Sequence, residues 1–124
     1  MTRRPLVAAL ALLACSVSVG AASPVRKPVT HTVVIEGMQF TPATLTIRSG
    51  DSVMWVNKDI VEHTATTPAS AKRSFDSGMI AVGKSWKRSF KASGTYDYIC
   101  TYHPTMKGVI KVTPAPSAAR PSRR

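Results

Sequence analysis

Hydrophobic and polar positions alternate in several short segments along the middle of the chain. In GTYDYIC, residues 94–100, the side chains of Tyr96, Tyr98 and Cys100 stand two positions apart. Side chains two apart on a strand share a face, so these three should point into the core while Asp97 meets water. We therefore expect the Cys100 thiol at the end of a strand, on its buried face.

Five further segments combine this alternation with β-branched or aromatic residues, and turn residues separate them. They are HTVVIEG (31–37), ATLTIRSG (43–50), DSVMWVN (51–57), KSWKRSF (84–90) and GVIKV (108–112). No stretch of the sequence shows the periodicity of an amphipathic helix. Short strands at this spacing predict an all-β fold, a small β-sandwich.

Residues 1–22 have the layout of an export signal. Arg3 and Arg4 precede the apolar run PLVAALALLACSVSVG, and small residues follow it. We interpret the segment as a cleaved signal peptide rather than a retained membrane anchor, because the run is short and interrupted by serines. The LLAC sequence ending at Cys15 resembles a lipoprotein cleavage box, and only lipidation there would tether the protein to a membrane. The sequence thus predicts a periplasmic or secreted protein.

The rest of the chain divides into three parts. We interpret residues 23–30 as an extended leader, residues 31–113 as one folded domain, and residues 114–124 as a disordered basic tail rich in proline and alanine. A domain of this size can bury a core, although not a large one. We expect it to be a monomer.

The chain is strongly basic, with a formal net charge of +11. A basic surface can attract nucleic acid, an anionic membrane or an acidic protein. Export excludes nucleic acid, and the charges are scattered through strands and turns without an aromatic-interleaved patch. We expect the charge to steer the protein toward an acidic partner; the alternative is a solvated basic face without a partner.

A candidate metal site lies in CTYHPTM, where Cys100, His103 and Met106 recur every three residues. Cys100 is the single cysteine left after signal cleavage, and an unpaired cysteine in an exported protein is reactive, intermolecular or metal-bound. His63, in the long loop after residue 57, can add a second imidazole to this set.

The four side chains offer two imidazoles, one thiolate and one thioether. This soft set favours a blue-copper electron-transfer centre, in which one Cys and two His lie in a plane and Met binds weakly. Zinc gains little from a thioether, and hard ions need carboxylates that the loop lacks. His31 has no soft or acidic neighbour in the sequence, so we interpret it as a surface residue.

The folded part of the chain resembles the cupredoxins, of the plastocyanin and amicyanin type. The resemblance runs through MQFTPATLTIRSGDSVMWVNKDIVEHTAT and FDSGMIAVGKSWKRSFKASGTYDYICTYHPTMKGVIKV. It implies a Greek-key β-sandwich of about eight strands with one copper ion, Cu(I) or Cu(II), at one end. It gives the ligand roles to His63, Cys100, His103 and Met106, and the short ligand loop is most similar to that of amicyanin.

The chain departs from the family pattern around the first histidine, where it has EHT at 62–64. The family often has a proline before this histidine, whereas Glu62 adds a negative charge that should favour Cu(II) slightly. Thr64 occupies a position where asparagine is frequent. The resemblance implies that its N–H reaches the cysteine sulfur and that its side chain binds the residue after the cysteine, here Thr101.

We expect an electron carrier and not an enzyme, because copper oxidases and nitrite reductases need further histidines and only His31 is left. Docking to redox proteins such as a c-type cytochrome or a dehydrogenase should use an apolar patch around His103. The residues of this patch are Met38, Val61, Met79, Tyr102 and Pro104. Core packing is the competing interpretation of the two methionines.

Two other classes of function use the same residues differently. A periplasmic copper-delivery protein would bind the metal through the same ligands and exchange metal instead of electrons. An immunoglobulin-like structural module with an incidental thiol would leave the four-ligand pattern unexplained.

Overall fold

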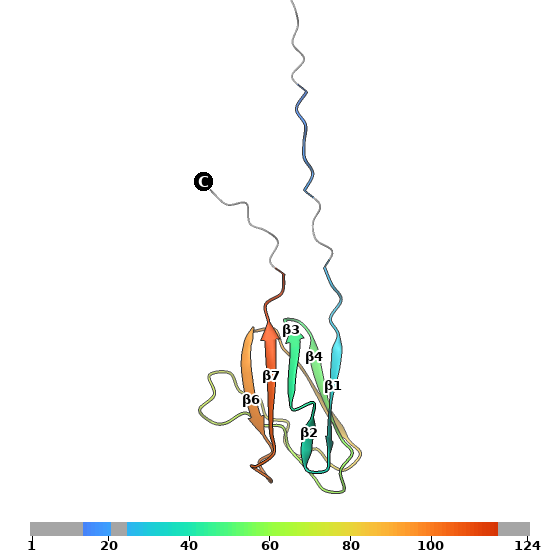
Figure 1. Ribbon diagram of the computed structural model, residues 1–124, viewed down its shortest axis with the longest axis vertical. Helices are drawn as coiled ribbons and strands as arrows, with labels where there is room; N and C mark the ends of the chain where they lie inside the picture. Colours follow the sequence, from blue (N-terminus) through green and yellow to red (C-terminus); the bar gives the residue numbers. More distant parts are fainter. Residues whose placement is uncertain (1–13, 21–24, 117–124) are drawn as a thin grey trace, which may run out of the picture.

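Seven strands form two sheets in the computed structural model, which describes residues 14–20 and 25–116 (Figure 1). The strands are β1 Thr30–Glu36, β2 Gln39–Thr41, β3 Thr44–Arg48, β4 Ser52–Asn57, β5 Ser85–Ser89, β6 Gly94–Ile99 and β7 Lys107–Thr113. Within the described residues the structure contains no helix that is long and apolar enough to cross a membrane.

The two sheets have the strand orders β2-β1-β4-β5 and β3-β7-β6. β1 runs parallel to β4 and β3 runs parallel to β7, whereas the other neighbours are antiparallel. The chain passes from one sheet to the other after β2, after β3 and after β5. The predicted all-β, Greek-key sandwich is confirmed.

Aromatic rings fill the core between the sheets, and Trp55 on β4 lies among them with no exposed surface. Its neighbours in the cluster are Phe75, Trp86, Phe90 and Tyr98. β4 is buried or half-buried along its whole length, because β1 and β5 flank it within the sheet. The largest side chain of the core therefore belongs to the most enclosed strand.

β6 alternates as predicted. Tyr96, Tyr98 and Cys100 are buried, whereas Asp97 between the tyrosines is exposed. Cys100 directly follows β6, and this strand ends at the end of the sandwich that lies opposite the start of β1 and the end of β7 (Figure 1). The alternation thus places the Cys100 thiol on the core side, at one end of the sandwich.

The strand count differs from the expected eight at one place. Between β4 and β5, residues 58–84 form no strand and pair only through isolated bridges. Two of these bridges, His63–Ile80 and Thr66–Asp76, lie within the segment, and Thr66–Ile99 joins it to β6. This segment therefore follows the sandwich without forming a further strand. β2 has no counterpart in the sequence prediction, because its three residues are too few for an alternation to show.

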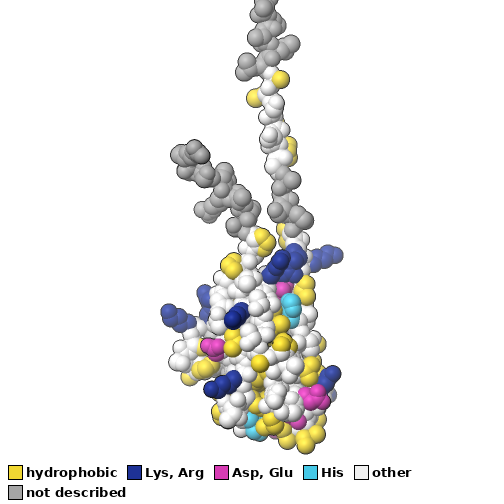
Figure 2. All heavy atoms as spheres, viewed as in Figure 1, with side chains coloured by type: hydrophobic (Ala, Val, Ile, Leu, Met, Phe, Trp, Pro, Cys, Tyr) yellow, Lys and Arg dark blue, Asp and Glu magenta, His cyan; other side chains and the backbone are white. Residues whose placement is uncertain are grey.

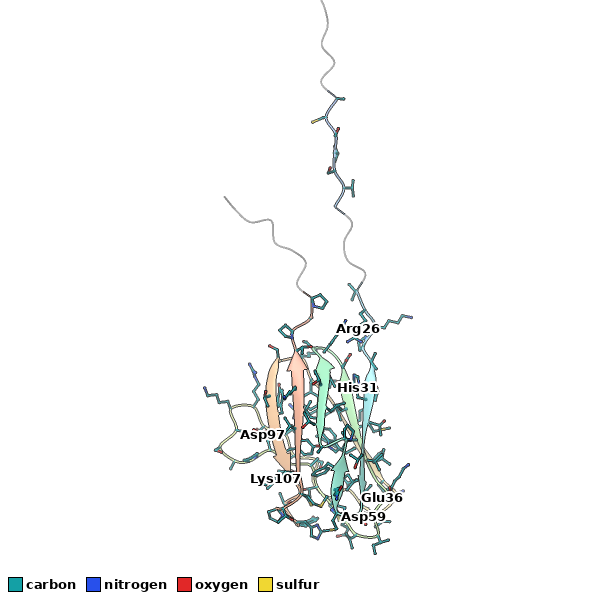
Figure 3. The ribbon with its side chains drawn as sticks, viewed as in Figure 1. Arg26, His31, Glu36, Asp59, Asp97 and Lys107 are labelled. Carbon is teal, nitrogen blue, oxygen red and sulfur yellow. The ribbon has the colours of Figure 1, made fainter. Side chains whose placement is uncertain are left out.

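Asp51 lies at the other end of the sandwich, with a side chain that is 2 % exposed. It accepts hydrogen bonds from Arg26 Nη2 at 2.7 Å, the Val29 N–H at 2.9 Å and the Arg48 N–H at 3.2 Å. His31 Nε2 lies 2.9 Å from Asp51 Oδ2, and the His31 side chain is 29 % exposed, so His31 lies at the surface as expected but contacts an acid that its neighbours in the sequence did not indicate. Figure 3 shows Arg26 and His31 on the side of the termini.

Replacing Asp51 with asparagine should lower the free energy of unfolding at neutral pH by about 1.5–3 kcal/mol, the range for a hydrogen bond to a charged group. Burial by itself would raise the pKa of Asp51, but hydrogen bonds, first that from the Val29 N–H, hold the pKa well below its ordinary value. Such a carboxyl stabilises the folded state above its unfolded pKa of about 3.9, and this contribution is lost as the pH falls toward the folded pKa. Denaturant unfolding of the two proteins should therefore give free energies that converge below about pH 4. A difference that persists unchanged in acid would show that Asp51 acts through packing alone.

Most of the predicted signal peptide and most of the predicted tail lie outside the described residues. Residues 14–20 form neither helix nor strand. β7 ends at Thr113, the expected end of the folded domain, and β1 begins at Thr30, one residue before its expected start. Through Arg26 and Val29 the predicted leader also contacts the domain. The domain boundaries otherwise stay predictions.

Candidate metal centre

The connection between β6 and β7 forms a tight loop that closes on itself. The Cys100 N–H donates to the Met106 carbonyl at 3.2 Å, the His103 N–H to the Cys100 carbonyl at 3.2 Å, and the Met106 N–H to the His103 carbonyl at 2.9 Å. The two strands that flank the loop are paired with each other up to Ile99 and Lys107. The backbone alone therefore holds these three side chains close together.

His63 reaches the same end of the sandwich from the long connection between β4 and β5. Its N–H donates to the Ile80 carbonyl at 3.3 Å, and the Ile80 N–H donates back at 2.7 Å. Asn57 Nδ2 donates to the carbonyls of Ile80 and Val61, at 2.9 and 2.8 Å. These contacts fix the segment in place, and the His63 side chain has no exposed surface.

Three donor atoms from these segments converge. Cys100 Sγ lies 3.7 Å from His63 Nδ1 and 3.7 Å from His103 Nδ1, and the three atoms all lie within 4.8 Å of one another. One ion with bonds of about 2.0 Å to nitrogen and about 2.3 Å to sulfur, about 120° apart, places the sulfur about 3.7 Å from each nitrogen. The residues therefore fit a single metal ion in a trigonal set. Met106 is 3 % exposed and belongs to the same buried cluster as Cys100.

Thr64 connects the two ligand-bearing segments. Its N–H donates to Cys100 Sγ at 3.4 Å, and its hydroxyl oxygen accepts the Thr101 N–H at 2.9 Å and lies 3.0 Å from Thr101 Oγ1. The contact expected between Thr64 and Thr101 is therefore present in the structure. A hydrogen bond to sulfur favours its ionised form, which is the form that binds metal.

Asp59 was not among the residues expected from the sequence, and it contacts His63 at Nε2, the ring nitrogen that does not face Cys100. Asp59 Oδ2 lies 3.0 Å from His63 Nε2 and accepts the Met38 N–H at 2.9 Å. Hydrogen bonds from the N–H groups of Met38 and Ile60 hold the pKa of Asp59 below its ordinary value. A spacing of four residues brings side chains together on a helix. This segment is not helical, so the sequence held no signal for the contact.

Exposed apolar side chains lie next to the residues of this centre. Their exposed fractions are 42 % for Met38, 39 % for Val61, 55 % for Met79 and 51 % for Tyr102, and Pro104 is exposed as well. The core-packing interpretation of the two methionines is therefore wrong. Figure 2 shows hydrophobic side chains gathered at the end opposite the termini, while Lys and Arg are spread over the other end and the sides.

Comparison with known proteins agrees with this geometry. Residues 28–113 match the family described as copper binding proteins, plastocyanin/azurin family. Amicyanin from Paracoccus versutus is 31% identical over 126 residues, which cover 90% of this chain and 96% of that protein. Chloroplastic plastocyanin from Tetradesmus obliquus is 38% identical over 72 residues, 52% of this chain and 50% of that protein. A reduced Cu(I) form of an amicyanin variant superimposes with a TM-score of 0.62 at 30% identity, covering 66% of this chain and 80% of the other.

A Greek-key sandwich with a Cys–His–His cluster at one end defines a cupredoxin, a blue-copper protein. The family match spans nearly all of the sandwich. The chain belongs to the plastocyanin/azurin family of copper-binding proteins. It binds one copper ion and carries single electrons between redox partners, and it is not an enzyme.

Proposed function

We propose that this protein works in the periplasm and holds its copper ion through His63, Cys100, His103 and Met106. The observation that supports the proposal is the convergence of Cys100 Sγ and two imidazole Nδ1 atoms, with both sulfur–nitrogen distances at 3.7 Å. Two imidazoles, a thiolate and a weakly bound thioether are the ligand set of a blue-copper electron-transfer centre. When bound, copper supplies the redox chemistry by cycling between Cu(II) and Cu(I).

The protein residues supply the geometry and the charge. Cys100 provides the anionic sulfur, and the Thr64 N–H stabilises that charge. His63 is the buried imidazole, and Met106 would supply the weakly bound thioether that tunes the potential. Since the loop backbone is hydrogen-bonded within itself, the ligands need to move little when the oxidation state changes.

Electrons enter and leave through His103, which is the half-buried member of the cluster. Its sequence neighbours Tyr102 and Pro104 are exposed, and with Met38, Val61 and Met79 they offer an apolar docking patch. Methionine side chains adapt to different partner surfaces. The partners are redox proteins such as a c-type cytochrome or a dehydrogenase, with an acidic face toward this basic chain. Lipidation at Cys15 would add membrane anchoring to the same role.

Electron exchange with an acidic redox partner should slow as salt is added. The sequence after the predicted signal peptide holds 15 Lys and Arg residues against 6 acids, and this excess of positive charge attracts such a partner over a distance that salt shortens to about 10 Å at 0.1 M. Stopped-flow mixing of the copper-loaded protein with a c-type cytochrome should give a second-order rate constant that falls steadily with ionic strength. A rate constant that does not change with salt would contradict the acidic partner.

Copper delivery is the alternative function, and it makes the opposite prediction for metal exchange. A carrier should show a reversible reduction potential and keep its Cu(I) when a strong Cu(I) chelator is added. A delivery protein should lose the Cu(I) readily to the same chelator. Voltammetry and chelator competition on one preparation therefore separate the two functions.

A further inference from the structure

The Asp59 carboxylate makes three hydrogen-bonding contacts that together connect the metal centre with the docking patch. Its Oδ2 atom lies 3.0 Å from His63 Nε2 and accepts the Met38 N–H at 2.9 Å, while its Oδ1 atom accepts the Ile60 N–H at 2.9 Å. The Asp59 N–H itself donates to Asn57 Oδ1 at 3.0 Å. Asp59 lies at the same end of the sandwich as this centre (Figure 3). Both carboxylate oxygens therefore have a partner.

The contact between Asp59 Oδ2 and His63 Nε2 determines which ring nitrogen of His63 carries the proton. A carboxylate oxygen only accepts hydrogen bonds, so the Nε2 atom that faces Asp59 must be the protonated one. The other ring nitrogen, Nδ1, faces Cys100 Sγ at 3.7 Å and keeps its lone pair free. A histidine that binds metal through one nitrogen commonly donates the other N–H to a carboxylate, which fixes the ring and makes it a stronger donor.

The same carboxylate also orders the turn before β2. Met38 has a φ of 61°, a left-handed conformation that is uncommon for residues other than glycine. Its N–H points at Asp59 Oδ2, the atom that also faces His63. The Met38 side chain is 42 % exposed and belongs to the docking patch. One oxygen atom thus holds both a buried imidazole and an exposed residue of the patch.

We propose that Asp59 is a positioning residue that fixes the orientation and tautomer of His63 and lowers the reduction potential of the site. The proposal rests on the ligand role of His63 in the proposed function. A negative charge hydrogen-bonded to a ligand stabilises the more positive oxidised state more than the reduced state. Asp59 therefore biases the site toward Cu(II), and it ties the ligand to the patch that partners touch.

The test compares Asp59→Asn with Glu62→Gln in the copper-loaded protein. Both changes remove one negative charge near His63, but Glu62 is exposed and is adjacent to the ligand only along the chain. Asp59→Asn should weaken Cu(II) binding about tenfold relative to Cu(I), which raises the one-electron potential by about 59 mV. Glu62→Gln should raise it by much less. Equal shifts in the two variants, or no shift in Asp59→Asn, would overturn the proposal.

A measurement on the unaltered protein covers the case in which Asp59→Asn does not fold. In the diamagnetic Cu(I) form, long-range ¹H–¹⁵N spectra should show a slowly exchanging proton on His63 Nε2. An unprotonated or rapidly exchanging Nε2 would refute the role of Asp59. If the unaltered protein does not turn blue with Cu(II), the proposed function itself has failed. If the unaltered protein turns blue but the potential of Asp59→Asn and the His63 Nε2 proton do not behave as expected, the ligand set is correct and Asp59 has no role in positioning His63.

Discussion

Replacing Cys100 with serine should abolish the intense blue absorption that the protein acquires with Cu(II). A thiolate forms the strong, covalent copper bond on which this absorption depends, whereas a serine hydroxyl stays protonated near neutral pH and offers only a hard oxygen. Cys100 has no exposed surface, and its sulfur is the atom on which both imidazoles converge. We expect a complete loss of colour, the largest effect of any single substitution at this site.

The measurement is a visible spectrum together with an EPR spectrum after Cu(II) is added. The unaltered protein should show intense absorption and narrow copper hyperfine splitting, and Cys100→Ser should show neither. In the full-length, uncleaved chain Cys15→Ser is the matched control, because Cys15 is exposed and lies outside the folded domain. It should keep the full blue spectrum. Blue colour that survives in Cys100→Ser would remove the thiolate from the site, and a pale spectrum in the unaltered protein would favour copper delivery.

The ligand loop could be predicted from sequence because its geometry is local. Cys100, His103 and Met106 lie within one loop, and the alternation of β6 determines the face on which the thiol lies. The identity of His63 as a partner followed from its position after β4 and from the shortage of other histidines. Such inferences need only strand periodicity and donor chemistry.

The contacts of the two acids could not be predicted in this way. Asp51 meets His31 across 20 residues, and Asp59 meets His63 within a segment that has no regular structure. Both contacts depend on how turns pack against strands, which no periodicity encodes. Met38 is exposed, as its place in the expected docking patch requires, although composition alone left core packing open because methionine is common both in cores and on adaptable surfaces.

The pairing of β6 with β7 fixes the two ends of the ligand loop, and the Tyr98 side chain lies against Gly108 in that pairing. Tyr98 on β6 is the register partner of Gly108 on β7. A Cβ atom added at Gly108 would overlap the ring and the hydroxyl oxygen of Tyr98. Tyr98 is 1 % exposed, and burial raises its pKa to about 12. Its ring is therefore enclosed by protein and can make room for a methyl group only if its neighbours move as well.

Gly108→Ala should destabilise the fold by about 1–3 kcal/mol or more, because overpacking forces side chains off their rotamers or moves the backbone. That is a large part of the roughly 5–15 kcal/mol that stabilises a typical domain. The two strands should move apart next to the ligand loop, where Cys100 follows the last residue of β6 and Met106 precedes the first residue of β7. Copper binding should therefore weaken as well. Denaturant unfolding of the metal-free protein and a Cu(I) competition assay measure the two effects separately.

A double-mutant cycle identifies Tyr98 as the cause. In a Tyr98→Leu background the smaller side chain leaves room for the methyl group, so Gly108→Ala should cost less there than in the unaltered protein. Residues in contact typically show coupling energies of about 0.5–3 kcal/mol, and independent ones add. Additive effects would mean that the methyl group is accommodated without moving Tyr98. The geometry of the ligand loop would then depend on the hydrogen bonds within the loop and not on this strand contact. Coupled effects, accompanied by weaker copper binding, would show that the close approach of these strands holds Cys100 and Met106 at their spacing.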